Sequence, residues 1–259
     1  MVRMKIDRID EIIDLLGSTD IEDITLGINS LDEFLGQNLQ SIVEHFDTSS
    51  TKSSNGVKLT SFDNKNILIS SQDSFQYNLV SALLGYYKVV NRDLSKIDID
   101  TALLANRLLQ GLLLIHPNSR KLFHRPSNMR VILELLEKSE ISLGISLIST
   151  LIHILLKDFT NFRVFEANNG CSIIIKRFKL SSFDINQKQT TYSTFKSKRY
   201  NQQDLNFKII EFLLFYLIDE RRINTNFKTL EQKSNLFRKD FPEIDDLIDS
   251  LNELNDLQS

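Results

Sequence analysis

Residues 141–156, ISLGISLISTLIHILL, form the longest run of the chain without an acidic, lysine or arginine residue. A membrane span needs about 20 mainly apolar residues. This run is shorter, and four of its positions are serine or threonine. It is therefore predicted to be a helix of the protein core, with no insertion into a membrane.

Two other segments are almost as apolar around the whole helical circumference: ALLANRLLQGLLLI (102–115) and FKIIEFLLFYLI (207–218). A helix that is apolar on every side has to be covered on every side. The three segments therefore predict a layered stack of helices in which they lie in the middle.

An internal repeat sets the architecture of this stack. NSRKL (118–122) matches NFRVF (161–165) at an offset of 43, and each copy follows one of the apolar helices. HEAT and armadillo units have periods of 40–47 residues. The sequence thus predicts an all-α, armadillo/HEAT-like fold of stacked helical repeats, formed as a single domain over 1–259. The matched asparagines and arginines should tie turns to neighbouring helices through exposed carbonyls.

Apolar spacing places the remaining helices. An amphipathic N-terminal helix carries Ile6, Ile9, Ile13 and Leu16, and a second helix is predicted from Ser30, as N-cap, to Phe46. Further helices are predicted at 75–91, 101–115, 127–137, 140–157, 171–179, 204–219, 228–238 and 243–256.

Two polar stretches interrupt the pattern. Residues 47–66 are rich in Ser, Thr and Asn and are predicted to be a mobile loop, with a small hairpin in the 47–70 region as an alternative. Residues 181–202 form a second polar, basic insertion. This insertion is interpreted as a solvated loop, and the alternative is a segment that is phosphorylated or binds a partner.

The composition narrows the class of protein. The chain has 31 basic and 34 acidic residues, a balance that does not favour a nucleic-acid partner. Its single cysteine cannot form a disulfide within the chain, which fits a reducing compartment, the cytoplasm or the nucleus.

The strongest catalytic motif in the sequence is C-x5-R, formed by Cys171 and Arg177. A cysteine phosphatase needs a curled loop whose N–H groups bind phosphate and lower the thiol pKa. Here three consecutive isoleucines fill the interior and Phe178 follows the arginine, as expected for a packed helix or strand. The sequence also contains no cluster of metal ligands and no nucleotide-binding glycine motif. We therefore expect no enzymatic activity, cofactor or metal.

A longer segment, QGLLLIHPNSRKLFHRPSNMRVILELLE (110–137), resembles the fungal cell-division-control protein family of the septation initiation network. The shared pattern is a leucine run, H-P-x-S-R-x-L-F, then N-M and a leucine-rich helix. NFRVFEANNG (161–170), KIIEFLLFYLIDE (208–220) and the acidic helix in 231–253 are similar to later blocks of the family. The 47–66 and 181–202 stretches depart from it.

The resemblance implies a non-catalytic scaffold or regulatory subunit. Members of this family bind a germinal-centre-type protein kinase, act with other septation-network proteins at the spindle pole body, and promote septum formation and cytokinesis. One alternative is an armadillo-type adaptor for other partners. The other, less favoured, is a cysteine phosphatase that uses Cys171 and Arg177.

Two sets of residues are candidates for the partner surface. The first set belongs to the repeat turn: Ser119, Arg120 and His124. The second lies on the C-terminal acidic helix: Asp245, Asp246 and Asp249. Turn structure is the competing interpretation of the first set, and a solvated helix face is that of the second.

Overall fold

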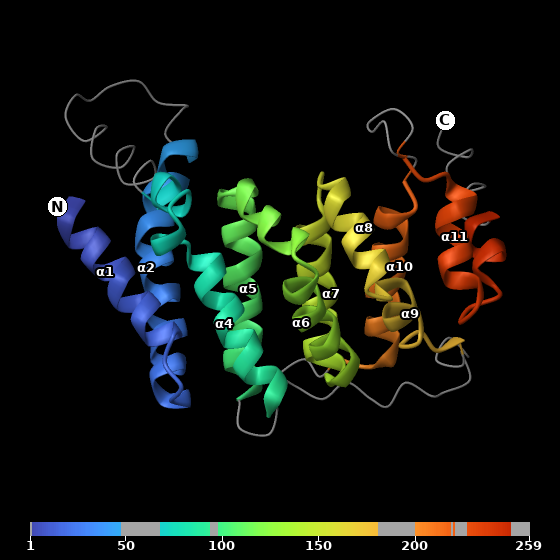
Figure 1. Ribbon diagram of the computed structural model, residues 1–259, viewed down its shortest axis with the longest axis horizontal. Coiled ribbons are helices and arrows are strands. Elements are labelled where there is room, and N and C mark those ends of the chain that lie inside the picture. Colours follow the sequence, from blue (N-terminus) through green and yellow to red (C-terminus); the bar gives the residue numbers. More distant parts are fainter. Residues whose placement is uncertain are drawn as a thin grey trace. The chain divides into compact units, whose positions relative to one another are not determined.

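The computed structural model describes residues 2–47, 68–93, 98–180, 200–218, 220 and 227–249, with the side chains of 2–6 and 38–47 excepted. Throughout these ranges the chain forms helices and no strand (Figure 1). The predicted all-α helical-repeat fold is thereby confirmed. The hairpin considered within 47–70 falls mainly on 48–67, outside the described residues, while 68–70 are helical.

The longer helices begin and end as follows: α1 Val2–Leu16, α2 Ile21–Asp47, α4 Leu79–Arg92, α5 Ile99–Ile115, α6 Pro126–Lys138, α7 Ile141–Leu155, α8 Phe159–Ala167, α9 Gly170–Ile175, α10 Gln202–Tyr216 and α11 Leu230–Arg238. Two further elements are 3-10 helices: η2 Phe75–Tyr77 and η4 Pro117–His124. Residues 244–249 are also helical.

The chain divides into two compact units, Met1–Leu122 and Phe123–Ser259, and the boundary falls inside η4. Each unit has its own set of buried apolar side chains. The prediction of a single domain over 1–259 stays a prediction.

In the first unit α1 packs against α2 and α4, and α5 packs against α2 and α4. The prediction that a helix begins at Ser30 was wrong, because α2 begins at Ile21 and contains that serine. Gly27 of α2 lies where this helix contacts α1. Here it lets two helices approach closely: a Cβ at this position would lie 3.0 Å from the Cβ of Leu15 in α1.

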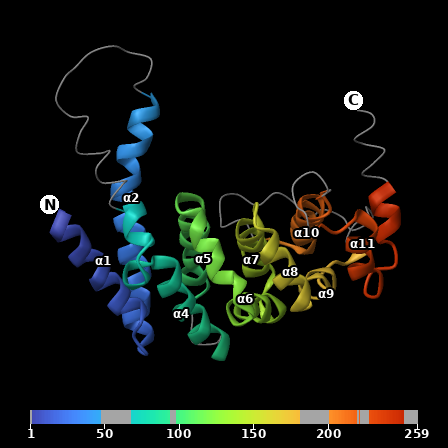
Figure 2. The ribbon, with the colours of Figure 1, turned by 45° about the horizontal axis from the view of Figure 1, so that its top comes forward.

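In the second unit α10 lies along α7, a neighbour relation that Figure 2 also shows. Helix α6 packs against α7, α8 and α9, and α11 packs against α9. The predicted helices at 101–115, 127–137, 140–157, 204–219 and 228–238 are confirmed within about three residues. None of the described helices is both long enough and apolar enough for a membrane span.

Two predicted helices and one predicted turn in the 75–220 region need correction. The helix predicted at 75–91 is divided at Asn78, whose side chain caps α4 by accepting a bond from the backbone N–H of Ser81. The helix predicted at 171–179 ends at Ile175. The second repeat copy, 161–165, was predicted as a turn but lies inside α8.

The polar insertion predicted at 181–202 falls mainly outside the described residues, which resume at Tyr200. Its last residue, Gln202, already belongs to α10. A capping box fixes this start, because the side chains of Asn201 and Asp204 each accept a bond from the other's backbone N–H.

Candidate functional site

The H-P-x-S-R turn of the first unit is a buried polar cluster around His116. One ring nitrogen of this histidine lies 2.9 Å from a carboxylate oxygen of Asp73, and the other lies 2.8 Å from the hydroxyl of Ser119. The amide of Asn78 donates to the same hydroxyl at 3.1 Å. Arg120 donates to the carbonyl of Leu113 in the last turn of α5. The cluster thus connects the end of α5 to the segment that precedes α4.

The contacts described for Ser119 and Arg120 agree with the interpretation of these residues as turn structure. Both side chains are buried. The predicted role of Arg120, a bond to an exposed helix-end carbonyl, is confirmed. A direct contact of either residue with a partner stays a prediction, and it would require this turn to open.

His124 lies at the start of the second unit and pairs with Asp158. Its Nε2 lies 2.9 Å and 3.0 Å from the two carboxylate oxygens. Asp158 also caps α8 by accepting a bond from the backbone N–H of Asn161. The histidine is only partly buried. It therefore belongs both to the turn and to the surface.

The three C-terminal acids lie on one short helical segment, residues 244–249. Ile244 and Ile248 are buried, whereas Asp245, Asp246 and Asp249 are exposed. Asp245 forms an ion pair with Arg238 at 2.9 Å. These acids are accessible, and their binding to a partner stays a prediction.

Lys233 in α11 is a buried charged residue of the second unit and is 1% exposed. Its ammonium group lies 2.9 Å from a carboxylate oxygen of Glu220, which is 2% exposed. It also donates to the carbonyls of Tyr216 and Ile218, each at 2.7 Å. These three acceptors match the three N–H donors of a lysine. Lys233 therefore closes the C-terminal end of α10, where backbone carbonyls have no partner in the helix.

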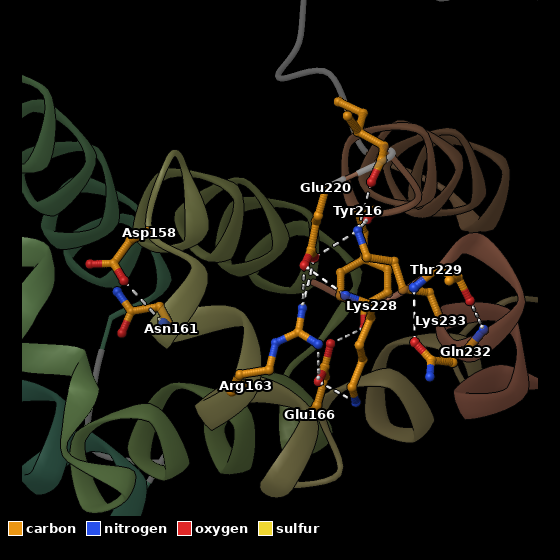
Figure 3. Close-up of polar contacts among 11 residues, drawn as sticks. Asp158, Asn161, Arg163, Glu166, Tyr216, Glu220, Lys228, Thr229, Gln232 and Lys233 are labelled. Atoms are coloured by element: carbon orange, nitrogen blue, oxygen red, sulfur yellow. Dashed lines mark hydrogen bonds and ion pairs between the residues drawn. The ribbon is translucent and has the colours of Figure 1, made fainter. Parts of the chain in front are cut away.

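Further charges extend this network to α8, as Figure 3 shows. Arg163 Nη2 donates to both oxygens of Glu220, at 2.7 and 2.9 Å, and Nη1 lies 3.3 Å from Glu166. The ammonium group of Lys228 lies 2.7 Å from Glu166. The hydroxyl of Tyr216 donates to the same carboxylate at 2.6 Å. We name these residues the α8–α11 ionic network: Arg163, Glu166, Tyr216, Glu220, Lys228 and Lys233.

Aromatic rings form the walls around the ammonium group of Lys233. It lies 5.1 Å from the centre of the Tyr216 ring and 5.4 Å from that of Phe162, within cation–π range. Burial lowers the pKa of Lys233 and raises that of Tyr216. The network thus holds a buried lysine through matched hydrogen bonds and ring faces.

Sequence reasoning did not find this network. The only available signal was that Lys233 stands four residues before Phe237, on the apolar side of a short amphipathic helix. A lysine in that position usually extends its charged end to water. Its carboxylate partner lies outside any helix, so helical spacing could not identify it. Arg163, predicted to bind a carbonyl, instead pairs with carboxylates.

Two surface grooves adjoin α8 in the second unit. The first has a volume of about 640 Å³ and reaches Arg163 of the network; it is lined by Pro126, Lys157, Asp158, Phe159, Thr160, Arg163, Val164, Ala167 and Asn168. The second, of about 520 Å³, lies among α6, α9 and α11 and shares Asn168 with the first. Side chains of both charges line it, among them Arg130, Glu137 and Asp240.

The C-x5-R pair is built into the helix packing. Cys171 is buried in α9, and burial raises the pKa of its thiol to about 12. Arg177 donates to the carbonyl of Leu136 at 2.6 Å and to that of Ser139 at 2.9 Å, at the junction of α6 and α7. A phosphatase needs the opposite arrangement, a thiolate at neutral pH and an arginine directed toward phosphate. The described part of the chain also has no group of three or more candidate metal ligands.

We predict that Cys171 reacts very slowly in the folded protein. A pKa near 12 in place of 9.0 lowers the thiolate fraction at pH 8 about a thousandfold. Iodoacetamide labelling at pH 8, followed by mass spectrometry, should therefore be slower in buffer than in 6 M guanidinium by at least this factor. Native labelling within tenfold of the unfolded rate would show an accessible, reactive thiol instead.

Comparisons with known proteins point to one family. The family described as "Cell division control protein 14, SIN component" matches residues 7–228. The chain is similar to the cell division control protein 14 of Schizosaccharomyces pombe (strain 972 / ATCC 24843), with 34% identity over 114 residues. These residues are 44% of this chain and 40% of the relative, so the match spans less than half of either protein. No solved structure matches the chain significantly.

Proposed function

Because the chain belongs to the family of cell division control protein 14, a component of the septation initiation network, we propose that it is a non-catalytic subunit of a kinase complex. Its partner is a protein kinase of the germinal-centre type. The subunit binds and positions this kinase, and thereby promotes septum formation and cytokinesis. Within the cytoplasm, its place of action is the spindle pole body, together with other septation-network proteins.

The observation that carries this proposal is the family match over residues 7–228. The geometry supports the non-catalytic role, because the buried polar side chains that could take part in catalysis instead bind backbone and side-chain groups between helices. Arg177 holds the α6–α7 junction, Lys233 closes α10, and the His116 cluster fixes a turn. Repeated helices that share apolar faces present extended surfaces suited to protein partners.

The cysteine phosphatase has no observation in its favour. The raised pKa of Cys171 and the carbonyl contacts of Arg177 both oppose it. An adaptor for unrelated partners would have the same architecture. Only the identity of the bound partner distinguishes this alternative from a kinase-binding subunit.

Affinity purification tests the proposal. Tagged protein isolated from dividing fungal cells should bring down a germinal-centre-type kinase near one-to-one, as quantified by mass spectrometry, and cells that express the tag alone give the background. A stable partner of another class, with this kinase absent, would favour the adaptor and refute the septation-kinase role.

A triple variant, Asp245→Asn, Asp246→Asn and Asp249→Asn, tests the predicted acidic surface in the same assay. Its side chains are exposed, so the fold should be retained. Loss of the kinase from the purified material would show that these acids belong to the binding surface. Recovery of the kinase at the wild-type level would show that they do not.

A further inference from the structure

The first groove beside α8 is lined by a threonine and two cations. Thr160, the second residue of α8, is exposed, and its hydroxyl forms no hydrogen bond within the described part of the chain. Lys157 stands three residues before it and Arg163 three residues after it, and all three side chains line the groove. An exposed hydroxyl thus shares a space of about 640 Å³ with two positive side chains.

Arg163 brings surplus positive charge to this groove. The α8–α11 ionic network contains three cations and two carboxylates, so one positive charge is not balanced within it. Lys233 is one of these cations, because its contacts to two carbonyls and to Glu220 use all three N–H donors of an ammonium group. Although Arg163 Nη1 lies 3.3 Å from Glu166, neither Nη1 nor Nε forms a hydrogen bond among the described residues. The network therefore leaves charge and N–H donors beside Thr160.

Lys157 adds a second cation. It is exposed, and its ammonium group forms no ion pair in the described ranges. The groove also contains one acid, Asp158, whose carboxylate is already bound by Nε2 of His124 at 2.9 Å and by the backbone N–H of Asn161 at 3.1 Å. The lining keeps a positive balance, which suits an oxyanion with several acceptor oxygens.

We propose that Thr160 is a phosphorylation site and that Lys157 and Arg163 hold its phosphate group in this groove. A phosphothreonine carries about −1.5 to −2 charges at pH 7 and three strong acceptor oxygens, which two cations can match. Basic residues on both sides of an acceptor are also a charge pattern by which protein kinases select substrates. The inference goes beyond the proposed function and does not depend on it, because it requires no stable kinase complex.

The reaction is a phosphoryl transfer from ATP. A bond forms between Oγ1 of Thr160 and the γ-phosphorus, while the bond from this phosphorus to the oxygen that bridges to the β-phosphate breaks. ADP leaves, and the hydroxyl proton passes to the catalytic aspartate of the kinase. Thr160 is accessible to a kinase, because it is exposed and because only the first turn of α8, where helices fray, has to open.

Phosphopeptide mapping tests the modification. Tagged full-length chain is purified from cycling and from mitotically arrested fungal cells with phosphatases inhibited. Trypsin cleaves after Lys157 and Arg163 and releases DFTNFR, in which Thr160 is the only hydroxyl residue. Mass spectrometry should find this peptide with one phosphate, and Thr160→Ala should abolish that species. Recovery of the peptide in unphosphorylated form alone, from both cultures, would overturn the inference.

The groove is tested separately with phosphothreonine incorporated at position 160 of the full chain. The matched control carries it at Thr19, an exposed threonine of the first unit that is followed by Asp20, Glu22 and Asp23. Titration by ³¹P NMR at equal ionic strength should show that the phosphate at 160 binds its last proton at least about threefold less tightly than that at 19, the scale of one exposed ion pair.

Lys157→Gln identifies the source of this difference. Added to the protein with phosphothreonine at 160, it should move the proton affinity of the phosphate toward the value at 19, and the fold should be retained because Lys157 is exposed. Equal proton affinities at the two positions, or no response to Lys157→Gln, would overturn the assignment of the groove as the place that holds the phosphate.

Discussion

Replacing Lys233 with alanine should lower the free energy of unfolding by about 3–5 kcal/mol, the range found when one partner of a buried ion pair is removed. The substitution leaves the carboxylate of Glu220 in a dry site, where Arg163 remains its charged partner. It also removes the donor for the carbonyls of Tyr216 and Ile218. The C-terminal end of α10 would lose its cap at the same time.

Chemical denaturation followed by circular dichroism measures this loss. Lys239→Ala is the matched control, because Lys239 is an exposed lysine directly after α11, and its removal should change stability by less than about 0.5 kcal/mol. Equal unfolding midpoints for the two variants would show that Lys233 does not hold α10 as described.

Replacing Gly170 with alanine should also be strongly destabilising, by about 3 kcal/mol. A Cβ at this position would lie well inside van der Waals contact of the Phe165 ring. The ring of Phe165 cannot yield easily, because it is buried with its centre 5.5 Å from that of Phe212 and 5.9 Å from that of Tyr216. Relief of the clash would therefore displace α8 or α10.

Gly111→Ala is the control for this substitution. No atom lies within 4 Å of a Cβ built at Gly111 in α5, so alanine should stabilise that helix by about 0.5–1 kcal/mol. The comparison uses thermal or chemical unfolding of the two variants. A Gly170→Ala protein as stable as Gly111→Ala would contradict the close contact of α8 with α9.

Helical periodicity predicted most of the fold because apolar spacing depends on local sequence. It was wrong where a polar or small residue has a tertiary role. Asn161 appeared to belong to a turn, yet it is buried in α8 and donates to the carbonyl of Ile154 at the end of α7. Ser30 was predicted to be an N-cap, yet it lies inside α2, which begins at Ile21.

The polar sites were less predictable than the helices. Arg163 and Glu220 are 57 positions apart, and no spacing rule connects them. Lysine and glutamate in a helical sequence normally indicate a solvated face. The burial of Lys233 was therefore not predicted. The repeat did identify Arg120 as a residue that ties a turn to a helix end.

The claim that the protein acts by binding and not by catalysis is tested most directly by Cys171→Ala in dividing fungal cells. This change removes the chain's only thiol and leaves a small apolar side chain in the same buried position. The measurement is the fraction of cells that form a septum, together with kinase recovery from the same cells. Both the septated fraction and the kinase recovery are expected to equal those of wild type. Loss of septation with kinase recovery intact would contradict the claim, because a folded, kinase-bound subunit would then require the thiol.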